Sequence, residues 1–101
     1  MNREAAVKSM IAQVFPQFRG ELQGHRVVLF GSRAEGTHRP RSDFDIGVVG
    51  PKPLPLKTFY RIEDELDALN TLYRVDWVDI NRVSERFRKE ALKNCEVLYE
   101  A

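Results

Sequence analysis

A Gly-Ser pair and two aspartates carry the chemistry-bearing pattern in the middle of this chain. Gly31-Ser32 follows the apolar run RVVLF (26–30), and Asp43 and Asp45 alternate within a second apolar run. A glycine after a strand lets a phosphate approach the exposed backbone N–H groups, because no Cβ stands in the way. Two carboxylates on one face of a strand repel each other, and Mg²⁺ or Mn²⁺ relieves that repulsion. The stretch predicts a phosphate-binding turn beside a metal-binding pair of acids.

Simpler explanations exist for the same residues. Gly31 and Gly36 have the glycine spacing of a P-loop, but Thr37-His38 stands where Lys-Ser/Thr is needed, and no GxGxxG occurs. Both of those motifs are excluded. An isolated Asp-x-Asp is also explained by a solvent-facing strand surface. On these residues alone that alternative stays open, with loop arginines as the counter-charges: Arg33, Arg39 and Arg41.

A third aspartate favours the catalytic interpretation. The segment YRVDWVDI (73–80) predicts a strand on which Asp76 shares a face with Val78, whereas Asp79 shares the face of Trp77. Carboxylates on neighbouring strands beside a phosphate turn form a two-metal phosphoryl-transfer layout. Asp79 is predicted to be a structural acid.

The elements that must position these residues follow from hydrophobic periodicity. The order is helix, strand, loop, strand, helix, strand, helix, strand, which predicts a small α/β (α+β) domain with helices covering one face of a sheet. Ser84 is expected to cap the last helix. The predicted helices cover 3–18, 57–70 and 84–94, and the predicted strands 26–30, 42–49, 73–80 and 96–99.

Bulk properties narrow the class of protein. A chain of 101 residues suits one domain, residues 1–101. The net charge of +1 does not indicate a nucleic-acid-binding protein. The single cysteine, Cys95, excludes an internal disulfide and a Cys-rich metal site. No long apolar segment indicates a signal peptide or membrane span, so a cytoplasmic location is expected. His25 and His38 are expected at the surface.

The pattern Gly-Ser, ten residues, Asp-x-Asp resembles that of nucleotidyltransferases, and Val75-Asp76-Trp77-Val78 resembles the strand with their third acid. The resemblance is nearest to minimal nucleotidyltransferases (MNT proteins). It implies a polymerase-β-like fold with a small mixed sheet, an ATP-like substrate, two Mg²⁺ ions and transfer of a nucleoside monophosphate. Its implied roles are triphosphate binding by Gly31 and Ser32, metal binding by Asp43 and Asp45, and a third catalytic, metal-binding carboxylate at Asp76. Arg33 is expected to neutralise the triphosphate or pyrophosphate.

The resemblance also implies a partner. MNT proteins are antitoxins of HEPN/MNT toxin–antitoxin pairs, and their acceptor has been linked to a tyrosine on the HEPN toxin. The chain is too short for an acceptor-holding domain, so another molecule must present the hydroxyl, and a hetero-oligomer is expected. Two alternatives stay open: a non-catalytic antitoxin that neutralises its partner by association, and a nucleotidyltransferase for an antibiotic. The candidates for a sticky partner surface are Leu54, Leu56, Tyr60 and Trp77.

Overall fold

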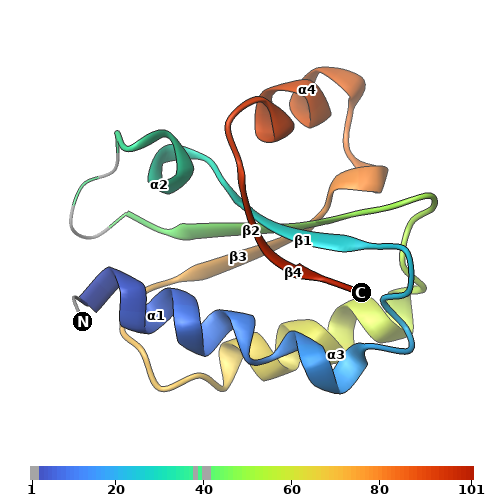
Figure 1. The fold of residues 1–101 in the computed structure, drawn as a ribbon, viewed down its shortest axis with the longest axis horizontal. Coiled ribbons are helices and arrows are strands. Elements are labelled where there is room, and N and C mark those ends of the chain that lie inside the picture. The colour runs from blue at the N-terminus through green and yellow to red at the C-terminus, as the bar shows by residue number, and fades with distance from the viewer. Residues whose placement is uncertain (1–2, 38, 40–41) are drawn as a thin grey trace.

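One mixed four-stranded sheet organises the molecule, which a computed structural model describes for residues 3–37, 39 and 42–101. The strand order is β3-β2-β1-β4; β1 runs antiparallel to both of its neighbours, and β2 and β3 run parallel. The mixed sheet expected from the sequence is confirmed (Figure 1). The strands are β1 (Arg26–Phe30), β2 (Phe44–Val49), β3 (Val75–Asp79) and β4 (Glu96–Glu100).

Helices α1 (Arg3–Ala12) and α3 (Leu56–Asp67) cover one face of the sheet (Figure 1). Alternate β2 residues point into this layer, where Phe44, Ile46 and Val48 are fully buried. The predicted first helix is shorter than expected, because α1 ends at Ala12 and a separate 3₁₀ helix, η1 (Phe15–Phe18), contains Pro16. Proline has no N–H to donate, so a regular α-helix cannot continue through it.

The opposite face carries a second, smaller core that the sequence did not predict. Phe30, Val49, Ile80 and Ala91 pack together there, beneath α4 (Glu85–Lys93) and beside η2 (Ile80–Arg82). The fold class holds, but helices lie on both faces of the sheet rather than on one (Figure 1). Ser84 caps α4 as expected, since its hydroxyl accepts from the Phe87 N–H at 3.1 Å. The remaining helix is α2 (Ser32–Glu35).

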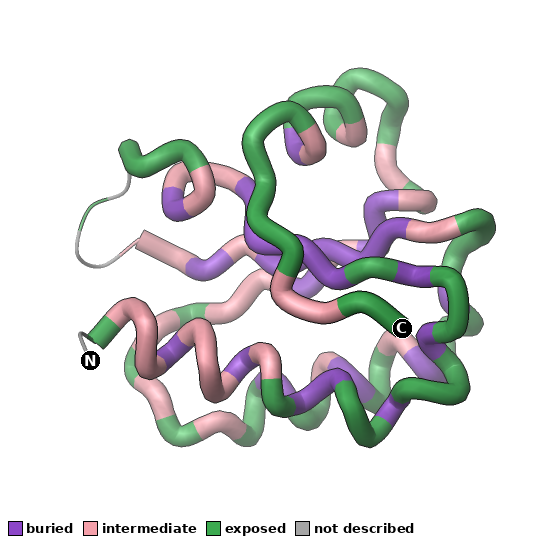
Figure 2. The backbone as a smooth tube through the Cα atoms, viewed as in Figure 1, coloured by how far each residue is buried: buried purple, intermediate pink, exposed green. Residues whose placement is uncertain are grey.

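Burial corrects two expectations about single side chains (Figure 2). Leu54 and Trp77 are buried and cannot form a sticky surface, whereas Leu56 and Tyr60 are exposed. His25 is also buried, because its ring lies between the Gln23 and Lys52 carbonyl oxygens, at 3.1 and 2.8 Å. His38 lies outside the described residues. Over the described part of the chain, no helix has the length and apolarity to cross a membrane.

Candidate active site

Asp45 and Asp76 meet on the face of the sheet opposite α1 and α3. They are direct partners in the parallel β2–β3 register, so their side chains leave the same face. Their carboxyl groups lie within hydrogen-bonding reach of each other, and the charge of Asp43, two residues before Asp45, also acts on Asp45. The structure therefore brings Asp45 and Asp76 into contact, with Asp43 close enough to be felt electrostatically.

The electrostatic state of Asp45 reflects this crowding. Burial is the main cause that raises the pKa of Asp45 above its usual value, and the neighbouring Asp76 and Asp43 charges raise it further. The hydrogen bond with Asp76 acts in the same direction. Excess negative charge that is partly shielded from water favours an added cation or a proton at this point.

Gly31 brings the predicted phosphate turn against these acids. Its φ of 75° is a conformation that L side chains rarely adopt, and a Cβ there would overlap the Asp45 carboxylate. The turn is closed by the Ala34 and Glu35 N–H groups, which both donate to the Gly31 carbonyl at 3.1 Å. Gly31, which follows the end of β1, therefore lies directly against Asp45 near the start of β2.

Arg33 does not fit its expected role at the triphosphate. Its side chain is buried, and its Nε and Nη2 donate to the Ser42 carbonyl at 3.1 and 2.9 Å. The guanidinium lies 4.1 Å from the centre of the Phe44 ring, within the α1-side layer, and 3.6 Å from the Glu4 carboxylate. A buried cation is held where its donors are satisfied, so Arg33 ties the two ends of the 31–42 loop together instead of facing Asp45.

Arg74 is a site residue that sequence reasoning missed. Its Nε donates to Asp76 Oδ1 at 3.0 Å, and its side chain is 75% exposed. The available signal was the i, i+2 spacing, which places Arg74 and Asp76 on one face of a strand. An ion pair this exposed is weak, so an incoming cation or phosphate can displace the arginine.

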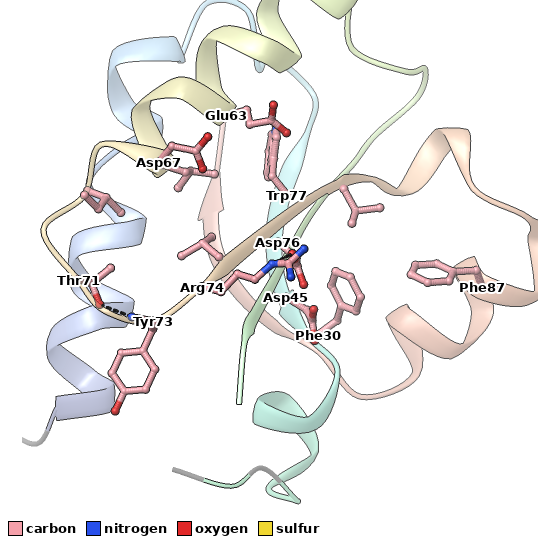
Figure 3. Close-up of a pocket in the computed structure, with 14 residues that line it drawn as sticks. Phe30, Asp45, Glu63, Asp67, Thr71, Tyr73, Arg74, Asp76, Trp77 and Phe87 are labelled. Carbon is pink, nitrogen blue, oxygen red and sulfur yellow. Dashed lines mark hydrogen bonds and ion pairs between the residues drawn. The ribbon is translucent and has the colours of Figure 1, made fainter. Parts of the chain in front are cut away.

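A hollow of about 730 Å³ is lined by Asp45, Arg74 and Asp76 (Figure 3), whereas Asp43 lines a separate hollow beside α1. Side chains of β3, of α3 and of the connecting loop line the first hollow, together with Phe30, Asp45 and Phe87. Asp79 lies outside it: the buried carboxylate accepts from the Leu54 and Asn81 N–H groups at 2.8 and 3.0 Å. Its predicted structural role is confirmed.

The carboxylates fit a hard divalent cation in their chemistry and spacing along the chain. Mg²⁺ prefers oxygen ligands and uses one or two carboxylates plus substrate phosphates. Within residues 3–37, 39 and 42–101, no three or more His, Cys, Asp or Glu side chains converge into a ready-made metal site. The expected set is thus assembled in part, with Asp45 and Asp76 in contact and Asp43 beside them.

This fold and this acid pair define a class of protein. Residues 16–101 match the family described as "Polymerase beta, Nucleotidyltransferase". The chain belongs to that family, and it is an enzyme of the nucleotidyltransferase class.

Within the nucleotidyltransferase class, the chain is similar to one named protein and to structures of toxin–antitoxin complexes. The chain is 29% identical over 85 residues to the Haemophilus influenzae protein named "Probable protein adenylyltransferase MntA", a match that covers 84% of this chain and 68% of that one. A crystal structure of a toxin–antitoxin with AMP-PNP aligns with a TM-score of 0.69 and 25% identity, covering 93% of this chain and 73% of that chain. The complex of a tri-AMPylated Shewanella oneidensis HEPN toxin with an MNT antitoxin shares the fold, with a TM-score of 0.66, 21% identity and coverage of 96% and 72%.

Proposed function

We propose that this chain is a Mg²⁺-dependent protein adenylyltransferase that acts as the antitoxin of a HEPN-type toxin. The observation that carries the proposal is the contact of Asp45 with Asp76 directly beside the Gly31 turn. The kinship with a protein named as an adenylyltransferase supports ATP as the nucleotide and a protein as the acceptor. The likeness to toxin–antitoxin structures supports the toxin as partner.

The proposed reaction transfers AMP to a hydroxyl group. The hydroxyl oxygen of the partner, a tyrosine by resemblance, forms a bond to the α-phosphorus of ATP. The bond from that phosphorus to the oxygen bridging the α- and β-phosphates breaks, and pyrophosphate leaves. The hydroxyl proton passes to the Asp76 carboxylate. The reaction therefore converts ATP and the partner's hydroxyl group into an AMP ester of the partner and pyrophosphate, and it releases one proton.

Each residue of the site has a part in this proposal. The backbone at Gly31 and the hydroxyl of Ser32 bind the triphosphate. Asp43, Asp45 and Asp76 would hold two Mg²⁺ ions, which when bound stabilise the attacking and leaving oxygens. Arg33 positions the metal-binding residue Asp43 indirectly, because its hydrogen bonds to the Ser42 carbonyl fix the end of the loop next to Asp43. The chain is proposed to act as a single minimal domain in the cytoplasm, where ATP and the partner are both present.

Label transfer tests the proposal directly. The protein is incubated with its HEPN-type partner and α-phosphate-labelled ATP, with Mg²⁺ or with EDTA. We expect label on the partner only with Mg²⁺, and a loss of at least about a hundredfold in Asp43→Asn/Asp45→Asn, as for removal of principal electrostatic groups. Asp64→Asn, on the exposed surface of α3, is the matched control.

A negative result has a defined meaning. Absence of label with the wild-type protein contradicts the catalytic proposal. If Asp43→Asn/Asp45→Asn still neutralises the toxin in cells as well as wild type does, the protein acts by association instead. If a small-molecule antibiotic is labelled and the partner is not, the antibiotic-modifying alternative replaces the proposal.

A further inference from the structure

The outer edge of β3 is open along the candidate active site. Among the residues that the structure describes, β3 is a terminal strand of the sheet and pairs only with β2. The Arg74 carbonyl accepts from the Phe44 N–H at 2.9 Å, so by alternation the backbone of Asp76 also faces β2. The N–H and C=O groups of Val75 and Trp77 therefore point outward, and no residue in the described part of the chain bonds to them. An unpaired strand edge of this kind is a template for another extended segment.

The hollow of the candidate site runs along this open edge. Residues from both faces of β3 line it, Asp76 and Val78 from one face and Val75 and Trp77 from the other (Figure 3). A segment added to β3 would thus lie within the same hollow as the acids. Its side chains would alternate between the Asp76 side and the α3 side.

The α3 side of the hollow carries unpaired negative charge. Glu63 and Asp67 lie four residues apart on α3, both line the hollow, and neither has a hydrogen-bond or ion-pair partner among the residues the structure describes. Among the described residues that line the hollow, Arg74 is the single basic side chain. In the proposed reaction the charges of Asp45 and Asp76 are offset by metal, which leaves Glu63 and Asp67 to face an incoming partner.

We propose that the partner protein presents its acceptor hydroxyl on an extended segment that pairs with the outer edge of β3, with basic residues facing Glu63 and Asp67. This inference rests on the proposed function and names how its acceptor is held. Strand alternation sets the pattern: with the hydroxyl on the Asp76 side, its two immediate neighbours lie on the α3 side. The segment that fits best has Lys or Arg at positions ±1 from the hydroxyl, not at ±2.

Backbone amide exchange of the full chain tests the pairing without relying on catalysis. The isotope-labelled protein is mixed, in Mg²⁺, with the peptide Thr-Val-Lys-Tyr-Lys-Val-Thr. We expect hydrogen exchange to slow by about tenfold at the Val75 and Trp77 amides, because each gains a partner. The Asp76 and Val78 amides already face β2 and should change less. Binding without protection at Val75 and Trp77, or no binding, overturns the proposal.

Two peptide controls sharpen the result. A peptide of the same composition with lysines at ±2, Thr-Lys-Val-Tyr-Val-Lys-Thr, should bind several-fold more weakly. Methylating the nitrogens of alternate residues in the ±1 peptide should block binding in one of the two possible sets and spare the other, since only one set of amides faces β3. Equal binding of the ±1 and ±2 peptides, or equal behaviour of the two methylated sets, contradicts edge pairing.

Protein variants assign the charge preference. Glu63→Gln/Asp67→Asn should remove the advantage of the ±1 peptide, whereas Asp64→Asn, outside the hollow, should leave it intact. Failure of the proposed function is a separate outcome. If the intact partner takes up label from ATP but no peptide protects the β3 edge, the docking proposal alone falls. If the peptide protects the edge but no label is transferred, catalysis falls and the docking surface stands.

Discussion

Asp45 and Asp76 are direct partners across the parallel strands β2 and β3, and their carboxyl groups lie within hydrogen-bonding reach of each other. Two acids in such contact cannot both carry full charge at low cost, so the metal-free site is held in a state that a cation or a proton relieves. The Gly31 turn lies against the same carboxylate, which places the acids where a bound phosphate would meet them.

Removing the ionisable group at Asp45 should stabilise the metal-free fold at neutral pH. The pKa of Asp45 is raised above its ordinary value of 3.8, so the folded state binds more protons than the unfolded state above that pH. Stability contributed by this group is therefore present at low pH and is lost as pH rises through the raised pKa. Asp45→Asn should exceed wild type in urea stability at pH about 7 in EDTA, and the gap should close near pH about 4.

Magnesium provides the internal check on that measurement. Added Mg²⁺ should stabilise wild type and have less effect on Asp45→Asn, because ligand binding to the folded state adds to its stability. Asp64→Asn, with an exposed carboxylate, should follow wild type throughout. A variant Asp45→Asn that is less stable than wild type at neutral pH in EDTA would contradict the predicted strain between the acids.

Among the glycines of the loop that follows β1, Gly31 should lose the most stability when it is replaced by alanine. Gly31→Ala combines a positive φ with an overlap on the Asp45 carboxylate, and we expect a loss of about 3 kcal/mol in unfolding free energy. Gly36→Ala has the same sign of φ but open space around it, and should cost about 1 kcal/mol. Denaturant unfolding of both variants separates the two contributions.

Further substitutions test the contact between Gly31 and the Asp45 carboxylate. Gly20→Ala, with neither positive φ nor a near neighbour, should be close to neutral. Asp45→Ala should recover part of the Gly31→Ala loss when the two are combined, because it removes the overlapping atoms. Strict additivity of the two changes would show that Gly31 does not press on Asp45.

Arg33 should act through the structure of the loop. Arg33→Lys keeps the charge but cannot place two donors on the Ser42 carbonyl, and we expect a loss of about 1–3 kcal/mol in stability without nucleotide. Arg39→Lys, an exposed position in the same loop, is the matched control. If stability is unchanged while ATP affinity falls, the side chain contacts phosphate after all.

Arg74 should compete with magnesium for Asp76. The arginine pairs with Asp76 at 3.0 Å in the metal-free protein, so Arg74→Gln should raise Mg²⁺ affinity several-fold at low salt. Titration calorimetry measures this, with Arg61→Gln on the exposed surface of α3 as control. The advantage should shrink at high salt, since exposed charges are screened. Weaker Mg²⁺ binding by Arg74→Gln would mean that the arginine helps to assemble the site.

The sequence predicted the acid positions and the strands well because both follow from local rules. Alternation placed Asp76 apart from Asp79, and apolar runs marked all four strands. The burial of Arg33 and His25 was not predictable in this way, since each is satisfied by carbonyl groups that only the folded chain brings near, such as Lys52 for His25. The position of α4 on the second face was likewise missed, because periodicity identifies a helix but not the face it covers.

The crossover from β2 to β3 through α3 has a consequence for biosynthesis. Asp45 and Asp76 become neighbours only after α3 has packed and β3 has joined the sheet, since a parallel pair cannot form through a tight turn. Pairing between strands far apart in the chain carries a loop-closure cost that must be met before the contact forms. A chain whose β3 has not yet joined the sheet, or has detached from it, therefore lacks the Asp45–Asp76 pair on which the proposed chemistry depends.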